Sequence, residues 1–127
     1  MTARNTLPIL LALAALAACG GAPGSDDPPV VVPGGDARQG RLALRAYGCT
    51  SCHAVPGVRG ARARVGPPLT GWAGRRYVAG RAPNEPETLM RFLRDPQSVA
   101  PGTAMPDVGV TAADARHIAA YLYTLGR

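Results

Sequence analysis

Five consecutive residues, Cys49-Thr50-Ser51-Cys52-His53, constrain this 127-residue chain more than any other feature. C-x-x-C-H is the attachment signature of a c-type haem. The two thiols can form thioethers with the vinyl groups on one haem edge, and the adjacent histidine can bind the iron from one face. The motif therefore predicts one covalent cofactor around which the chain folds.

Other chemistries use the same residues. A C-x-x-C pair alone can be a redox dithiol, usually near alternating strands and helices, but this chain shows no such alternation. A structural zinc site needs about four ligands, which here would include His117. A disulfide between Cys49 and Cys52 would leave His53 unexplained. The motif favours haem, and these three alternatives stay open at this point.

The second iron ligand is predicted to be a methionine, because electron-transfer haems of this type often carry Met opposite His. Met105 lies in the segment 100–106, where two prolines and a glycine break regular structure. It follows His53 by about fifty residues, so it can approach the iron from the other side. Met90 lies in a helical pattern, where packing is the simpler interpretation.

Residues 1–18 are typical of a lipoprotein signal peptide. Arg4 precedes an apolar run that is too short to span a bilayer of about 30 Å. Leu16-Ala17-Ala18-Cys19 resembles the bacterial lipobox, which implies lipidation of Cys19 and cleavage before it. With two cysteines on haem and one on lipid, no odd thiol remains.

Residues 19–35 are then a lipid-anchor cysteine and a flexible Gly/Pro tether, since they hold too little apolar content for a core. Residues 36–127 form the one folded domain. This organisation predicts a protein anchored by lipid on the periplasmic side of a bacterial membrane. It leaves open whether the inner or the outer membrane holds it.

The coarse pattern of the domain is helical. Asp36 can cap a helix that runs to about Ala46. Asn84 and Glu87 fit a capping box for a helix that Pro96 stops, and Thr111 with Asp114 fits another N-cap. Leu42, Leu44 and Tyr47 are the buried candidates of the first helix, and the last helix is expected to run to about Leu125.

All fourteen basic residues are arginines, and the formal net charge is +6. Residues 54–83 contain no acid and six arginines: Arg59, Arg62, Arg64, Arg75, Arg76 and Arg81. Because this segment follows the haem motif directly, it predicts docking to a partner with an acidic surface. An exported chain with few aromatic residues disfavours nucleic acid as the partner.

Several segments in order resemble the class I cytochromes c, a likeness that spans residues 36–127. The stretch from Arg75 to Met105 is also similar to the cytochrome c domain fused to subunit II of some haem-copper oxidases, although this chain has no copper-site domain. The segments are Cys49–His53, Gly66–Gly71, Gly74–Arg76, Thr88–Pro96 and Pro101–Pro106. The resemblance implies an all-α class I cytochrome c fold, with helices packed around one covalently bound haem.

The same resemblance implies a role for each matching residue. Cys49 and Cys52 would carry the thioethers, and His53 and Met105 would be the axial ligands. The other roles are a hydrogen bond from the ligand histidine to the carbonyl of Pro67, propionate contacts from Arg75 and Thr103, and a helix crossing formed by Gly40 and the helix around Tyr121. Two positions depart from the family: Phe92 replaces a tyrosine, and Trp72 comes too early for the tryptophan used beside a propionate.

These features predict an electron carrier of a periplasmic respiratory chain and not an enzyme. If His53 and Met105 fill both axial positions, no site remains for a small-molecule substrate. The expected partners are redox proteins: a terminal oxidase, a quinol-oxidising complex or a dehydrogenase. Two alternatives are an electron-transfer subunit of a periplasmic dehydrogenase, and a ligand-binding or peroxidatic sensor if Met105 leaves the iron.

Overall fold

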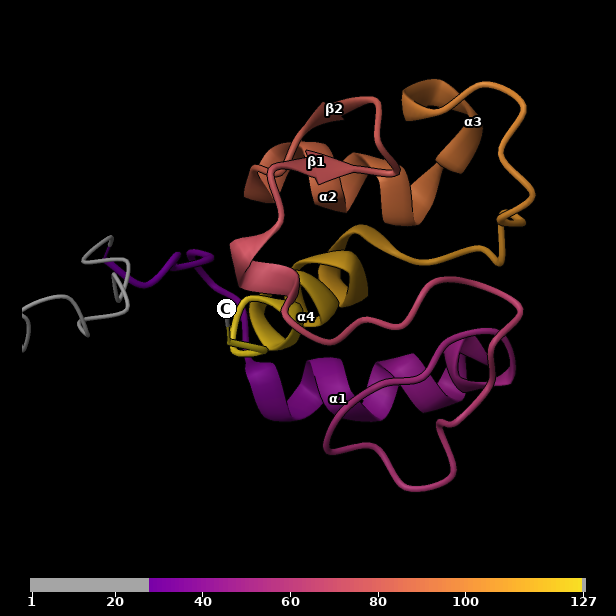
Figure 1. Cartoon of the computed structure of the whole chain (residues 1–127). Helices are drawn as coiled ribbons and strands as arrows, with labels where there is room; N and C mark the ends of the chain where they lie inside the picture. The colour runs from indigo at the N-terminus through magenta and orange to yellow at the C-terminus, as the bar shows by residue number, and fades with distance from the viewer. Residues whose placement is uncertain (1–27, 127) are drawn as a thin grey trace, which may run out of the picture.

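Helices are the main regular elements of the described chain, as predicted (Figure 1). The structure, a computed structural model, describes residues 28–126, so the predicted signal peptide and Cys19 lie outside the described residues. Its elements are α1 (Ala37–Ala46), the 3-10 helices η1 (Cys49–Ser51) and η2 (Trp72–Gly74), β1 (Tyr77–Val78), β2 (Ala82–Pro83), α2 (Pro86–Arg94), α3 (Pro96–Val99) and α4 (Ala112–Leu122). The two short strands form an antiparallel hairpin that the sequence did not predict. Among the helices of residues 28–126, none has both the length and the apolar character needed to cross a bilayer.

Side-chain caps start α1 and α4, which confirms two predictions. The Asp36 carboxylate accepts hydrogen bonds from the amides of Arg38 (2.8 Å) and Gln39 (3.0 Å). The Thr111 hydroxyl accepts from the amide of Asp114 at 3.1 Å. Each cap satisfies amides that have no partner within the helix. Helix α4 ends at Leu122, before the predicted Leu125.

The capping box predicted for α2 is wrong. The N-cap residue is Glu85, whose side chain makes no capping hydrogen bond, and Pro86 opens the helix. The Asn84 amide instead donates to the carbonyls of Trp72 and Arg75, both at 3.1 Å. The other boundary holds, because α2 ends at Arg94 before Pro96, which begins α3.

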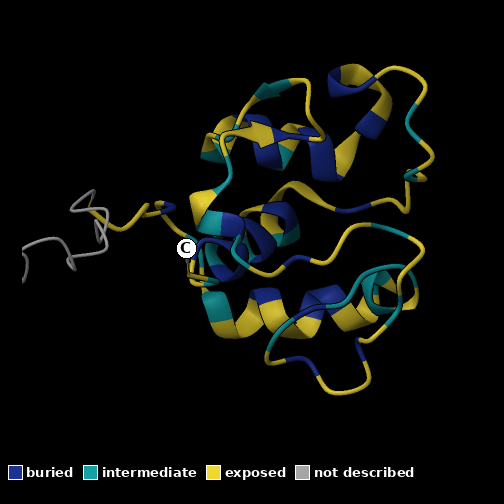
Figure 2. Cartoon of the chain, in the orientation of Figure 1, coloured by how far each residue is buried: buried dark blue, intermediate teal, exposed yellow. Residues whose placement is uncertain are grey.

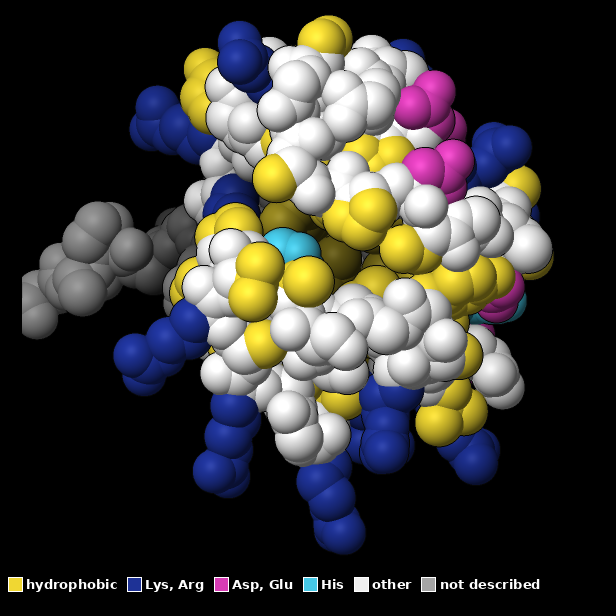
Figure 3. Space-filling view, turned by 90° about the vertical axis from the view of Figure 1, so that its right-hand side faces the viewer, with side chains coloured by type: hydrophobic (Ala, Val, Ile, Leu, Met, Phe, Trp, Pro, Cys, Tyr) yellow, Lys and Arg dark blue, Asp and Glu magenta, His cyan; other side chains and the backbone are white. Residues whose placement is uncertain are grey.

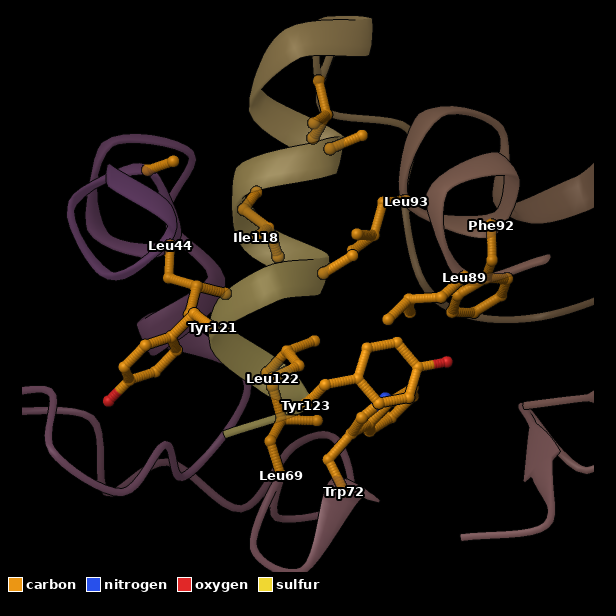
Figure 4. Packing of buried hydrophobic residues seen from close by; sticks show 14 of the residues in the cluster. Leu44, Leu69, Trp72, Leu89, Phe92, Leu93, Ile118, Tyr121, Leu122 and Tyr123 are labelled. Atoms are coloured by element: carbon orange, nitrogen blue, oxygen red, sulfur yellow. The ribbon is translucent and has the colours of Figure 1, made fainter. Parts of the chain in front are cut away.

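Helix α4 is the centre of the core, with α1 on one side and α2 on the other (Figures 1 and 4). The crossing of α1 and α4 needs Gly40, because a Cβ there would lie 1.9 Å from the carbonyl oxygen of His117. The resemblance placed the crossing around Tyr121, and the close contact lies one helical turn earlier, at His117. The Tyr121 hydroxyl instead donates to the carbonyl of Pro56 at 2.5 Å. The largest fully buried side chains of the three helices are Leu44, Leu89, Ile118 and Leu122.

Two burial patterns differ from expectation (Figure 2). Leu42 is 52% exposed, since it lies on the face of α1 away from α4, while Leu44 is buried. Val32 is buried in the core, and a Cβ on Gly35 would lie 2.7 Å from Cβ of Ala120. The packed domain therefore begins by Val32, ahead of the boundary expected at residue 36, and Gly35 lies against α4.

Candidate functional site

A cavity of about 480 Å³ lies between the helices and the two long loops. Its opening is the hollow in Figure 3, which looks onto the right-hand side of Figure 1 and shows a histidine side chain inside a largely apolar rim. All seven residues predicted to contact the haem line this cavity: Cys49, Cys52, His53, Pro67, Arg75, Thr103 and Met105. Residues 28–126 thus bring the whole predicted set together.

The two cysteines lie just after the end of α1, in and beside η1, where the chain lines the cavity. Gly48 adopts φ +72°, a left-handed conformation that suits glycine, and it lets the chain reverse from α1 into η1. Cys49 and Cys52 are half-buried and are not joined by a disulfide. Burial raises the pKa of the Cys49 thiol, which keeps it protonated at neutral pH.

Backbone contacts orient the ring of His53. Its Nδ1 lies 2.7 Å from the carbonyl oxygen of Pro67, which can only accept, so Nδ1 carries the proton. The other nitrogen, Nε2, is therefore left with a lone pair for a metal. Gly66 backs the ring so closely that a Cβ there would lie 2.3 Å from His53 Cε1. The Gly66 amide also donates to the carbonyl of Cys52 at 2.8 Å.

Met105 reaches the cavity from the loop that follows α3. The residue is half-buried and packs against the core. Its amide donates to the hydroxyl of Thr103 at 3.3 Å. The hydroxyl that was predicted to meet a propionate thus has a partner within the loop, although Thr103 also lines the cavity.

Arg75 is the one arginine among residues 28–126 that lines the cavity. Its guanidinium donates to the carbonyls of Pro68 and Thr70 and lies 5.0 Å over the ring of Trp72. Burial lowers the pKa of Arg75, but a guanidinium keeps its charge at any ordinary pH. A fixed cation at the cavity wall is suited to a carboxylate of the bound group.

Sequence reasoning missed a second set of contacts beside the cavity. The Tyr123 hydroxyl donates to the Asn84 side-chain oxygen at 3.0 Å, while the amide of Asn84 holds the carbonyls of Trp72 and Arg75. Burial, helped by Glu85, raises the pKa of Tyr123 to about 12. Asn84 therefore fixes the turn that carries Arg75. No local pattern signals this, because its partners come from other parts of the chain.

The residues present fit a haem better than the alternatives. The volume lies in the range of about 300–1,000 Å³ that is usual for cofactor sites, and the lining combines two thiols, an oriented imidazole and a thioether. His117, the fourth candidate zinc ligand, instead accepts the Asp36 amide at Nδ1 (3.0 Å). Within the described residues, no three His, Cys, Asp or Glu side chains group as a metal site.

The remaining arginines of segment 54–83 are exposed and lie outside the cavity lining. Figure 3 shows basic side chains projecting along the lower and left edges of the face that carries the opening, with acidic side chains at its upper right. The rim of the opening is largely apolar and includes Val65, which is 82% exposed, and Tyr77, which is 56% exposed. The face thus combines an apolar centre with a mainly basic periphery.

Comparisons with known proteins agree with this site. Residues 37–126 match the family model described as Cytochrome c. The chain is 37% identical over 90 residues to cytochrome c oxidase subunit 2 of Alkalihalophilus pseudofirmus, covering 70% of this chain and 25% of that one. It is 34% identical over 92 residues to cytochrome c oxidase subunit 2 of Bacillus subtilis, covering 71% and 26%. The chain thus spans about a quarter of the length of these curated relatives.

A solved structure shares the fold. Cytochrome c2 from Rhodobacter sphaeroides superposes with a TM-score of 0.52 and covers 73% of this chain and 98% of its own. The sequence identity is 24%, so this likeness concerns the fold alone. It confirms the predicted fold class of helices arranged around one cofactor site.

Proposed function

This chain belongs to the cytochrome c family, and on that premise we propose that it carries single electrons with His53 and Met105 as the axial ligands of its haem. As a member of that family it is an electron carrier with one covalent haem c, for which Cys49 and Cys52 supply the thiols. The observation that supports the ligand pair is that both cysteines, His53 and Met105 line one cavity. When bound, the haem supplies reversible one-electron exchange at its iron.

The chain's own residues then set the properties of that exchange. His53 donates from Nδ1 to the carbonyl of Pro67, which fixes the ring and strengthens Nε2 as a ligand. A thioether ligand such as Met105 raises the reduction potential. With a protein ligand on each face, no coordination position is left for a substrate, so the proposal favours a carrier over a catalyst.

The proposed role for Arg75 and Thr103 is at the propionates. Arg75 uses its terminal nitrogen on two backbone carbonyls, which holds the guanidinium at the cavity wall. Its other N–H groups stay available to a carboxylate. Thr103 lines the cavity from the opposite loop and can donate its hydroxyl hydrogen while its oxygen accepts from Met105.

The proposed partner on the electron-accepting side is a terminal oxidase, because the relatives are subunits of cytochrome c oxidase. A quinol-oxidising complex or a dehydrogenase would supply the electrons. The apolar rim with arginines around it suits a partner whose docking surface is apolar at the centre and acidic at the edge. Association should therefore slow as the salt concentration rises.

A spectrum with a redox titration of the purified holoprotein tests the ligand pair. We expect a low-spin ferric haem with the weak long-wavelength absorption band of sulfur ligation. Met105→Ala should abolish that band and lower the potential, while Met90→Ala, a change of the half-buried methionine of α2, should keep both. An unchanged spectrum and potential in Met105→Ala would reject Met105 as ligand.

We further propose that the chain is exported by residues 1–18 and anchored through lipid on Cys19, on the periplasmic side of a bacterial membrane. The support is the lipobox-like sequence that ends at Cys19. Cys19→Ala should move the holoprotein from the membrane fraction to the soluble fraction, since multiple acyl chains supply the anchoring. Retention of the variant in membranes after a salt wash would contradict the anchor.

A further inference from the structure

The loop that carries Met105 has few backbone hydrogen bonds. Among the described residues, the amides of the segment 100–106 make two: Ala100 to the carbonyl of Pro96, and Thr103 to that of Ala100. Gly102 adopts φ +83°, which interrupts regular structure. The position of Met105 must therefore depend on contacts made by side chains.

Gln97, on the short helix α3, supplies such a contact. Its side-chain nitrogen donates to the carbonyl of Thr103 at 2.9 Å, and its side-chain oxygen accepts from the amide of Gly102 at 2.8 Å. Both ends of the carboxamide are thus paired with neighbouring backbone groups of the loop, as a peptide of an adjacent strand would pair. Within residues 28–126, no other side chain from outside the loop bonds its backbone.

We propose that Gln97 is a positioning residue that keeps Met105 on the iron by tying down the loop at Gly102 and Thr103. The link continues through Thr103, whose hydroxyl accepts the amide hydrogen of Met105 at 3.3 Å. Withdrawal of Met105 requires the loop to move, and movement of the loop breaks the two hydrogen bonds of Gln97. This inference rests on the proposed ligation by Met105.

The location of Gln97 separates this role from support of the core. The side chain is exposed, and α3 holds its own form through the Asp95 carboxylate, which accepts from the Ser98 amide at 3.2 Å. Loss of two exposed hydrogen bonds weakens a local contact without opening a cavity. Removing Gln97 should therefore favour opening of the loop and leave global unfolding nearly unchanged.

Imidazole titration of the ferric holoprotein measures that opening, because imidazole takes the position that Met105 leaves. Gln97→Leu keeps the bulk and removes both hydrogen bonds, and it should tighten imidazole binding about tenfold. Gln97→Glu keeps the acceptor for the Gly102 amide and should give a smaller change. Ser98→Ala is the matched control, since the Ser98 hydroxyl bonds Asp95 and not the loop, and it should bind imidazole as the wild type does.

Amide hydrogen exchange provides a second measurement that does not depend on ligand binding. The Gly102 amide should exchange faster in Gln97→Leu and at the wild-type rate in Ser98→Ala. A wild-type protein without the sulfur band would reject the ligation by Met105 itself. A wild-type protein that has the band, together with equal imidazole affinity in Gln97→Leu and the wild type, would overturn the role of Gln97. An equal rise of imidazole affinity in Gln97→Leu and Ser98→Ala would overturn the role of Gln97 as well.

Discussion

On the His53 side of the cavity, several segments are joined by backbone hydrogen bonds, whereas on the Met105 side a single loop is held mainly by side chains. The amides of Gly66 and Leu69 donate to the carbonyls of Cys52 and Ala54, both at 2.8 Å. These bonds tie the motif to the loop that supplies the carbonyl of Pro67. The Met105 loop has no such partner segment among the described residues and depends on Gln97 and Thr103.

This contrast indicates on which side the cavity can open. Opening the cavity on the His53 side would break backbone hydrogen bonds between distant segments, so we expect it to occur only with global unfolding. Opening on the Met105 side would break only the few side-chain hydrogen bonds of Gln97 and Thr103, so we expect it to occur as a local motion of low free energy. With the proposed ligands His53 and Met105, we expect ligand exchange at the iron on the Met105 side only.

The largest expected effect comes from crowding the His53 side. Gly66→Ala places a Cβ 2.3 Å from the His53 ring, and the ring cannot yield without losing its bond to Pro67. We expect the free energy of unfolding of the holoprotein to fall by about 1–3 kcal/mol in denaturant titrations. Gly126→Ala is the control, because a Cβ there meets nothing within 4 Å. Equal losses in the two variants would show that the His53 side is not tightly packed.

A smaller and more local effect is expected on the Met105 side. Thr103→Val keeps the shape of the side chain and removes the acceptor for the Met105 amide. Imidazole should bind the ferric variant about threefold more tightly, because one partly buried hydrogen bond is lost. The free energy of unfolding should stay within about 0.5 kcal/mol of the wild type. A global loss as large as that of Gly66→Ala would remove the distinction between the two sides.

The smallest effect concerns Asp114, which supports the His53 side from α4. Hydrogen bonds from Tyr47 and Thr111 lower the pKa of its carboxyl below 3.8. A lowered pKa means that the stabilisation is present above pH 3.8 and is lost as the pH falls through the folded-state pKa. Asp114→Asn should therefore be slightly less stable than the wild type at pH 7, and the gap should be smaller at pH 3, which lies below the unfolded-state pKa of 3.8. Urea titrations at both pH values measure it, and a gap that widens in acid would contradict the assignment.

Local chemistry explains most of what the sequence predicted correctly. Asp36 and Thr111 cap helices through amides two or three residues away, so a short pattern contains the whole interaction. The haem motif is equally local. The loop around Met105 was also recognisable from its prolines and glycine, and the resemblance added the pairing of His53 with Pro67.

Interactions between distant segments explain what was missed. Asn84 looks like a cap in sequence, but its amide serves Trp72 and Arg75, and Tyr123 lies 39 positions further on. Gln97 contacts residues only five or six positions away, yet the shape of their loop follows from Gly102 and from packing, not from any periodic pattern. Val32 is buried in a core whose position depends on the whole fold. Such contacts become visible only once the helices are placed.

The packing of Gly35 against α4 has a consequence for how this domain can be joined to other polypeptides. The segment that leads into α1 and the C-terminal end of the described chain lie close together on the left of Figure 1, while the opening faces right. A sequence fused at either end would therefore leave the face with the cavity opening uncovered. The fold can in this sense be fused to a larger chain as a domain without changing the face that carries the opening.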